Sequence, residues 1–174
     1  PAVRHLIANM KARLVCVPEE SVLQPSLHDA SFFDAYEVKN PQTERSPLAI
    51  WLDTVQKTPT WVNQSMALRN SIVARLGLKH AGDLSSFDFS KKAKDYQVGD
   101  RVGIFTVYEI SENEVIMGED DKHLDVRLSL FTLDHGARVV VSTVVHVKNW
   151  LGHLYMFFVK PMHRIIAPTV LSKI

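Results

Sequence analysis

Residues 123–148 read HLDVRLSLFTLDHGARVVVSTVVHVK and predict a β-hairpin. Two strand-like runs, 123–133 and 137–148, flank the turn-forming sequence Asp134-His135-Gly136. A connection this short makes the two strands antiparallel neighbours. If the chain turns at its glycine, the numbers of residues that lie opposite each other add up to 271.

That register separates the side chains of the hairpin into an apolar face and a polar face. The apolar face pairs Leu124, Val126, Leu128 and Leu130 with Val147, Val145, Thr143 and Val141. The polar face pairs His123, Asp125, Arg127 and Ser129 with Lys148, His146, Val144 and Ser142. Each large apolar side chain that is fully buried stabilises a protein by roughly 1.5 to 3 kcal/mol, so we expect the apolar face to contact the core.

Upstream of the hairpin, the sequence predicts one strand and two short helices. Residues 31–38 are rich in aromatic side chains and predict a strand. Ser46-Pro47 and Thr58-Pro59 are both helix-start signals, a capping hydroxyl followed by proline at the first helical position. The second of these helices is expected over 59–76 and ends at Gly77.

The remaining segments predict a meander of strands and a long C-terminal helix. Residues 81–97 lack a clear period and read as a connection with room for an edge strand, and strands follow at 101–110 and 114–117. Residues 150–174 are apolar on nearly every side at first, which is typical of a buried helix. Proline at 161 cannot donate to the carbonyl four residues earlier, so a bend or break is expected there.

This order of elements predicts an α+β fold in which a curved antiparallel sheet wraps around one long C-terminal helix. Such an arrangement leaves space at its mouth, which the two short helices would close, so a cavity is expected. We expect a single domain over 31–174, preceded by an extension over 1–30 that forms a short helix or strand. Within that extension, residues 3–14 show a basic amphipathic pattern.

Composition excludes several classes of protein. With 174 residues, 46% hydrophobic and 22% charged, the chain suits one globular domain. A net charge of +1 gives no field for holding a polyanion, which argues against a nucleic-acid partner. The most apolar stretch, 150–159, is about half as long as the roughly 20 residues of a membrane-spanning helix.

Motifs for cofactors and for the common nucleophilic sites are missing. The sequence has no Gly-rich phosphate loop, no His-Glu-x-x-His and no Gly-x-Ser-x-Gly, so no cofactor is expected. The one cysteine, Cys16, has no disulfide partner, which suits the reducing cytoplasm, and its apolar neighbours place it in the core. His153 and His163 are ten residues apart on a helix and cannot share a metal ion, so no metal site is expected.

Three interpretations of the polar face of the hairpin stay open. It could be a solvated outer face whose charges discourage association between sheets. The curvature of the sheet could instead bring it to a cavity mouth or a partner surface, where Arg127 would bind a carboxylate. In the third interpretation His123, Asp125 and His146 are catalytic or bind a metal, although His-x-Asp is a weak signal.

Several motifs in order resemble one protein family. Residues 120–130 read DDKHLDVRLSL, residues 143–149 read TVVHVKN, residues 151–155 read LGHLY and residues 159–163 read VKPMH. Together with Asp34-Ala35-Tyr36-Glu37-Val38, Trp61 and Leu68-Arg69-Asn70, they resemble the bacterial domain of unknown function family 2867. The resemblance runs from about residue 31 to the C-terminus.

The resemblance implies a fold similar to the START and Bet v 1 (SRPBCC) helix-grip domains. Proteins of that superfamily commonly hold lipids, sterols or polyketides between sheet and helix, and a minority are cyclases or hydrolases. Relatives also occur behind NAD(P)-binding dehydrogenase-like domains, although this chain has no loop for the nucleotide. The narrower family supplies no reaction that could be carried over to residues here.

We therefore expect a small hydrophobic ligand, such as a lipid, a polyketide or an aromatic compound, between sheet and helix. Its expected contacts are Arg127, Arg69, Trp61, Met66, Tyr155 and Phe158. One alternative is a cyclase, isomerase or hydrolase in which Asp125 orients His146 as a general base. Another is an interaction module that forms a homodimer or docks on a dehydrogenase-like protein.

Overall fold

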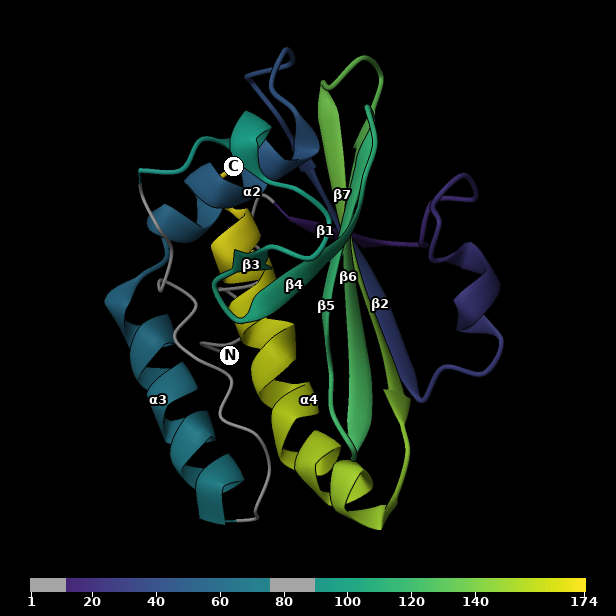
Figure 1. Ribbon diagram of the computed structural model, residues 1–174, viewed down its shortest axis with the longest axis vertical. Coiled ribbons are helices and arrows are strands. Elements are labelled where there is room, and N and C mark those ends of the chain that lie inside the picture. Colours follow the sequence, from purple (N-terminus) through teal and green to yellow (C-terminus); the bar gives the residue numbers. More distant parts are fainter. Residues whose placement is uncertain (1–11, 76–89) are drawn as a thin grey trace.

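The computed structural model describes residues 12–75 and 90–174, and Figure 1 shows a sheet with its α-helices on one side. The sheet has seven antiparallel strands in the order β1-β2-β7-β6-β5-β4-β3. Its strands are β1 (Arg13–Val15), β2 (Phe32–Lys39), β3 (Arg101–Val102), β4 (Phe105–Ile110), β5 (Glu114–Asp120), β6 (Leu124–Leu133) and β7 (Arg138–Val147). The helices are α2 (Pro47–Gln56), α3 (Thr60–Arg75) and α4 (Trp150–Leu171), with short 3-10 turns η1 (Gln24–Leu27) and η2 (Ala93–Asp95). The predicted α+β class is confirmed.

The hairpin of β6 and β7 has the predicted register. Asp125 pairs with His146, and Leu124 pairs with Val147, so opposite numbers add up to 271 as expected. The turn residue Gly136 has a φ of 84°, in the left-handed region that glycine tolerates best. Because the register is correct, the predicted division into an apolar and a polar face also holds.

Helix starts follow the signals in the sequence. The hydroxyl of Ser46 accepts a hydrogen bond from the backbone N–H of Ala49 at 3.3 Å and caps α2. Asn149 caps α4 in the same way, since its side-chain oxygen accepts from the N–H of Gly152 at 3.1 Å. Helix α2 begins at the predicted Pro47 and α3 begins within one residue of its predicted start, whereas the expected stop at Gly77 lies outside the described residues.

Helix α4 does not break at Pro161, although a break was one of the two outcomes that we expected there. It runs as one helix from Trp150 to Leu171 with that proline inside it. Pro161 and Phe157, whose carbonyl loses its partner, both lie on the exposed side of the helix, where water can satisfy the carbonyl. Residues on both sides of the proline, including Tyr155 and Val170, are buried, so both halves of α4 pack against the protein interior.

The predicted strand over 101–110 is two strands. Gly103 has a φ of 60° and turns the chain between β3 and β4, which pair with each other. Within the expected connection over 81–97, residues 90–97 contain η2 and no strand, and the rest lies outside the described residues.

Part of the N-terminal segment belongs to the sheet. β1 pairs with β2, and the chain then crosses to the side of the sheet away from the helices, where Figure 1 shows η1 in purple. The expected amphipathic helix over 3–14 falls mostly outside the described residues, and its last two residues lie in β1. Cys16 is exposed, not buried as predicted, because Val15 and Val17 on either side of it turn toward the sheet.

The main core lies between the sheet and the α-helices. Fully or almost fully buried side chains from β5, β6, α2 and α4 meet there, among them Met117, Leu130, Val55 and Leu171. In the part of the chain that the structure describes, no helix is both long and apolar enough to cross a membrane.

Candidate functional site

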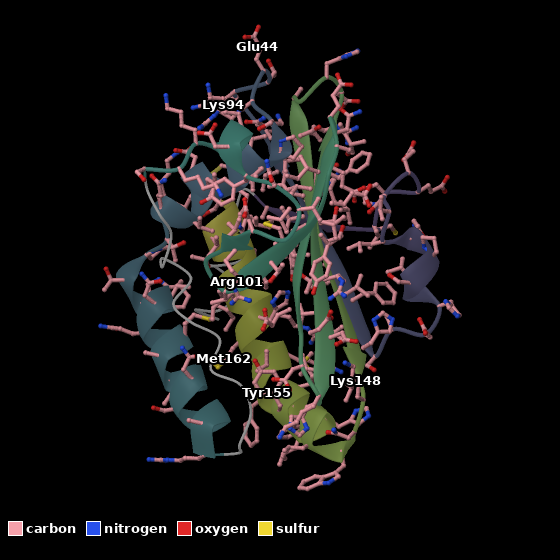
Figure 2. The ribbon with its side chains drawn as sticks, in the orientation of Figure 1. Glu44, Lys94, Arg101, Lys148, Tyr155 and Met162 are labelled. Carbon is pink, nitrogen blue, oxygen red and sulfur yellow. The ribbon has the colours of Figure 1, made fainter. Side chains whose placement is uncertain are left out.

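A cavity of about 210 Å³ lies between the apolar face of the sheet and α4. Helices α2 and α3 complete its wall through Trp51, Val55, Ser65 and Met66. Its other lining residues are Phe32, Tyr36, Ile104, Phe105, Val126, Leu128, Val141, Thr143, Val145, Tyr155, Met156, Val159, Met162, His163, Ile166, Ala167, Val170 and Leu171. Figure 2 labels Tyr155 and Met162, which come from α4.

The cavity is large compared with the voids of a packed core. Voids larger than one water molecule are few in a protein interior, and one water molecule needs roughly 10 to 15 Å³ of cavity volume. A hollow many times that size, walled almost entirely by apolar side chains, is what a small-molecule site needs. The indole N–H of Trp51, in its wall, is buried and has no acceptor within the described chain.

Strand β2 brings a carboxylate to the polar end of this cavity. Phe32, Asp34 and Tyr36 alternate along the strand and therefore share one face, and the two aromatic rings line the cavity. The Asp34 side chain is nine-tenths buried. Its Oδ1 lies 3.1 Å from Nε2 of His163, which reaches it from α4, and its Oδ2 is buried without a partner among the described residues. The ring of His163 also meets Phe32 edge to face.

Two hydroxyl groups accompany the Asp34–His163 pair. Thr143 lines the cavity and is the cross-strand partner of Asp34 in the β2–β7 register. The structure gives its hydroxyl no hydrogen-bond partner in the described chain. Burial, and secondly the nearby Asp34 carboxylate, raise the pKa of the Tyr36 hydroxyl, which therefore stays protonated at neutral pH.

The four candidates on the polar face of the hairpin lie across the sheet from this cavity and have separate partners. Asp125 pairs with Lys148, whose Nζ is 2.5 Å from Oδ1. Nε2 of His146 lies 3.0 Å from Asp29 Oδ1 and from the carbonyl of Ser26. The described residues therefore contain no Asp125–His146 dyad of the kind that an acid–base reaction needs.

His123 and Arg127 are also engaged away from the cavity. Nδ1 of His123 lies 3.1 Å from the Asn149 side-chain oxygen. Arg127 donates to Asp120 at 2.7 Å and stacks 4.1 Å from the centre of the Tyr108 ring. The hydrogen bond from Arg127 lowers the pKa of Asp120 to about 2. Arg127 therefore holds a carboxylate of its own chain.

The N-terminal segment covers much of this outer face. Leu23 packs there with Ile116 and Val144, which are both almost fully buried. Glu114, only 3% exposed, accepts hydrogen bonds from the hydroxyls of Ser21, at 2.6 Å, and Ser129, and from the N–H of Val22 at 3.0 Å. Part of the face that could have been exposed to solvent is therefore buried, and it forms a second, smaller core.

The expected ligand contacts are distributed unevenly. Met66 and Tyr155 line the cavity. Trp61 and Phe158 are 42% and 51% exposed and do not line it. Arg69 lies in α3, and its side chain is outside what the structure describes. Of the predicted side chains that the structure describes, two therefore line the cavity.

Sequence reasoning missed the polar end of the cavity, although both of its main residues carry a signal. Asp34 is an acidic residue between two aromatic residues on the core-facing side of a strand. His163 interrupts an apolar stripe on α4 that also contains Val159, Ile166 and Val170. Polar residues on faces that are otherwise apolar mark either a satisfied core group or a site.

Among residues 12–75 and 90–174, no group of three or more His, Cys, Asp or Glu side chains is placed to hold a metal ion. The polar end of the cavity has one carboxylate and one imidazole from these residue types. These two groups can form hydrogen bonds and transfer protons.

The comparison with protein families gives a match over almost the whole fold. The model of the family described as "Protein of unknown function (DUF2867)" matches residues 26–170. The chain belongs to the DUF2867 family. The matched region begins within η1 and includes every cavity-lining residue named above except Leu171. No curated protein and no solved structure matches this DUF2867 chain significantly.

Proposed function

We propose that this DUF2867 protein is a helix-grip domain of the START and Bet v 1 kind that binds a small hydrophobic molecule between its sheet and α4. The observation that carries the proposal is the apolar cavity of about 210 Å³ at that place. An apolar molecule of suitable size would gain roughly 25 cal/mol for each Å² of its surface that leaves water.

The polar end of the cavity supports a ligand that is not purely hydrocarbon. Asp34 and His163 are coupled to each other, and the Thr143 hydroxyl is open to a new partner. A few polar groups in an otherwise apolar pocket typically fix the orientation of a bound molecule. The ligand class is therefore an apolar body with one polar substituent.

Two adjacent isoleucines on α4 give a matched test. Ile166 lines the cavity, whereas Ile165 is 43% exposed and does not. Purified protein is titrated with the uncharged fluorescent probe N-phenyl-1-naphthylamine, and Ile166→Trp and Ile165→Trp are titrated alongside it. The proposal expects saturable binding at one site that is lost in Ile166→Trp and kept in Ile165→Trp.

Two outcomes would contradict the proposal. One is the absence of saturable probe binding to the wild-type protein, and the other is equal binding to both variants. Native mass spectrometry of freshly purified protein adds a second readout, since a retained apolar molecule would appear as a discrete added mass.

A further inference from the structure

The geometry at the polar end of the cavity determines which nitrogen of His163 carries a proton in the neutral ring. Nε2 faces a carboxylate oxygen of Asp34 at 3.1 Å, and a carboxylate accepts hydrogen bonds, so the hydrogen belongs on Nε2. Nδ1 is then the basic nitrogen. It has no hydrogen-bond partner in the described parts of the chain, and His163 is one of the residues that line the cavity.

Asp34 also holds the ring in place. The carboxylate is nine-tenths buried, and its second oxygen has no donor within the described residues. The hydrogen bond to Asp34 therefore fixes the orientation of the ring and leaves Nδ1 as its second nitrogen.

Two hydroxyl groups lie close to Asp34. Thr143 faces it across the two strands and has no hydrogen-bond partner in the described chain, and the Tyr36 hydroxyl lies near enough to the Asp34 carboxylate for that charge to help raise its pKa. Preplaced hydroxyl donors stabilise negative charge that develops on a substrate oxygen. A base and oxyanion donors at one end of an apolar hollow are the parts that enolisation of a ketone requires.

We infer that the cavity is an active site for proton transfer on an apolar ketone, an inference that rests on the proposed function. His163 is the base, Thr143 is the oxyanion donor and Asp34 is the positioning residue. The bond between hydrogen and the carbon next to the carbonyl breaks, and its proton goes to Nδ1. The electron pair forms the enolate, whose oxygen accepts a hydrogen bond from Thr143. If the hydrogen on Nδ1 is first replaced by one from the solvent, its delivery to the same carbon gives exchange, and delivery to a conjugated carbon gives an isomer, so nothing is oxidised or reduced.

The test uses 2-tetralone, a bicyclic apolar ketone, in heavy water. Mass spectrometry follows the incorporation of deuterium beside the carbonyl, after subtraction of the rate in buffer alone. His163→Gln should lower kcat by about 100-fold, the range that a general base contributes. His146→Gln, on the outer face, should exchange at the wild-type rate, which separates this inference from a reaction on the polar face of the hairpin.

Two further variants separate positioning from structural roles. Asp34→Asn should lower kcat by about tenfold or more with an unchanged KM, since it leaves the hollow intact and removes the group that orients the ring. Thr143→Val keeps the shape of the side chain and should also lower kcat. A variant that merely disturbed the fold would lose ketone binding and raise KM as well.

Binding of the ketone, measured by displacement of N-phenyl-1-naphthylamine, keeps the two proposals apart. If 2-tetralone displaces the probe but exchanges only at the buffer rate, the inference fails and the proposed function stands. Equal rates in wild type and His163→Gln would also overturn the inference. If neither the probe nor the ketone binds, both fail together.

Discussion

Replacing Ala167 by leucine measures directly how empty the cavity is. Ala167 lies on α4, is partly buried and lines the hollow. Leucine adds three carbon atoms, and both residues are good helix formers, so the change acts almost entirely through packing. With about 210 Å³ available, the added atoms enter free space. At roughly 0.8 kcal/mol for each buried methylene-sized group, the variant should gain about 2 kcal/mol of unfolding free energy.

The assay is urea unfolding followed by fluorescence and by circular dichroism, with titration of N-phenyl-1-naphthylamine in parallel. The same leucine should weaken probe binding by at least about tenfold, because ligand and side chain compete for one space. Ala67, exposed on α3, supplies the control, and Ala67→Leu should change stability by less than about 0.5 kcal/mol. If Ala167→Leu instead lowered the unfolding free energy by about 1 to 3 kcal/mol, the core would be overpacked. That result would show that there is no free space beside Ala167.

Two predictions concern the other side of the sheet. Glu114→Ala removes the acceptor that holds Ser21 and Ser129, so it should lower the unfolding free energy by about 3 kcal/mol and make 16–31 the first site of limited proteolysis. Asp120 has a pKa of about 2, below its ordinary value of 3.8, so its ion pair with Arg127 contributes stability above about pH 4 that is lost as the pH falls toward 2. Because the Asp120 side chain is 47% exposed, the loss should be under about 1 kcal/mol, and Arg127→Met should abolish it when unfolding is compared at pH 6 and pH 3.

Local signals accounted for most of the fold. The register of β6 and β7 followed from one turn and from alternation, because a shift by one residue would exchange the two faces. A capping serine located the start of α2 for a similar reason, since few side chains can satisfy the free N–H groups of a helix start, whereas α4 was expected from its apolar side chains. The split at Gly103 was missed because a lone glycine in a strand-like run is also compatible with a continuous strand.

The site was harder to predict because it depends on contacts between distant segments. Asp34 and His163 each stand out locally only as a polar residue on an apolar face, and the sequence does not show that they meet. The polar face of the hairpin looked more promising because its charges lie close together in the sequence. Its charges proved to be paired within the chain, and Val144 is buried under the N-terminal segment by contacts that no local pattern encodes.

The Asp34–His163 contact spans 129 residues of sequence. During synthesis on the ribosome, the strand with the carboxylate emerges long before the helix that completes the chamber. A partly synthesised chain without this helix would expose the apolar face of its strands to water. Chaperones bind exposed apolar surface of this kind. Contacts between residues so far apart in sequence also slow folding. The ability to bind a ligand should therefore form late in the folding of each chain.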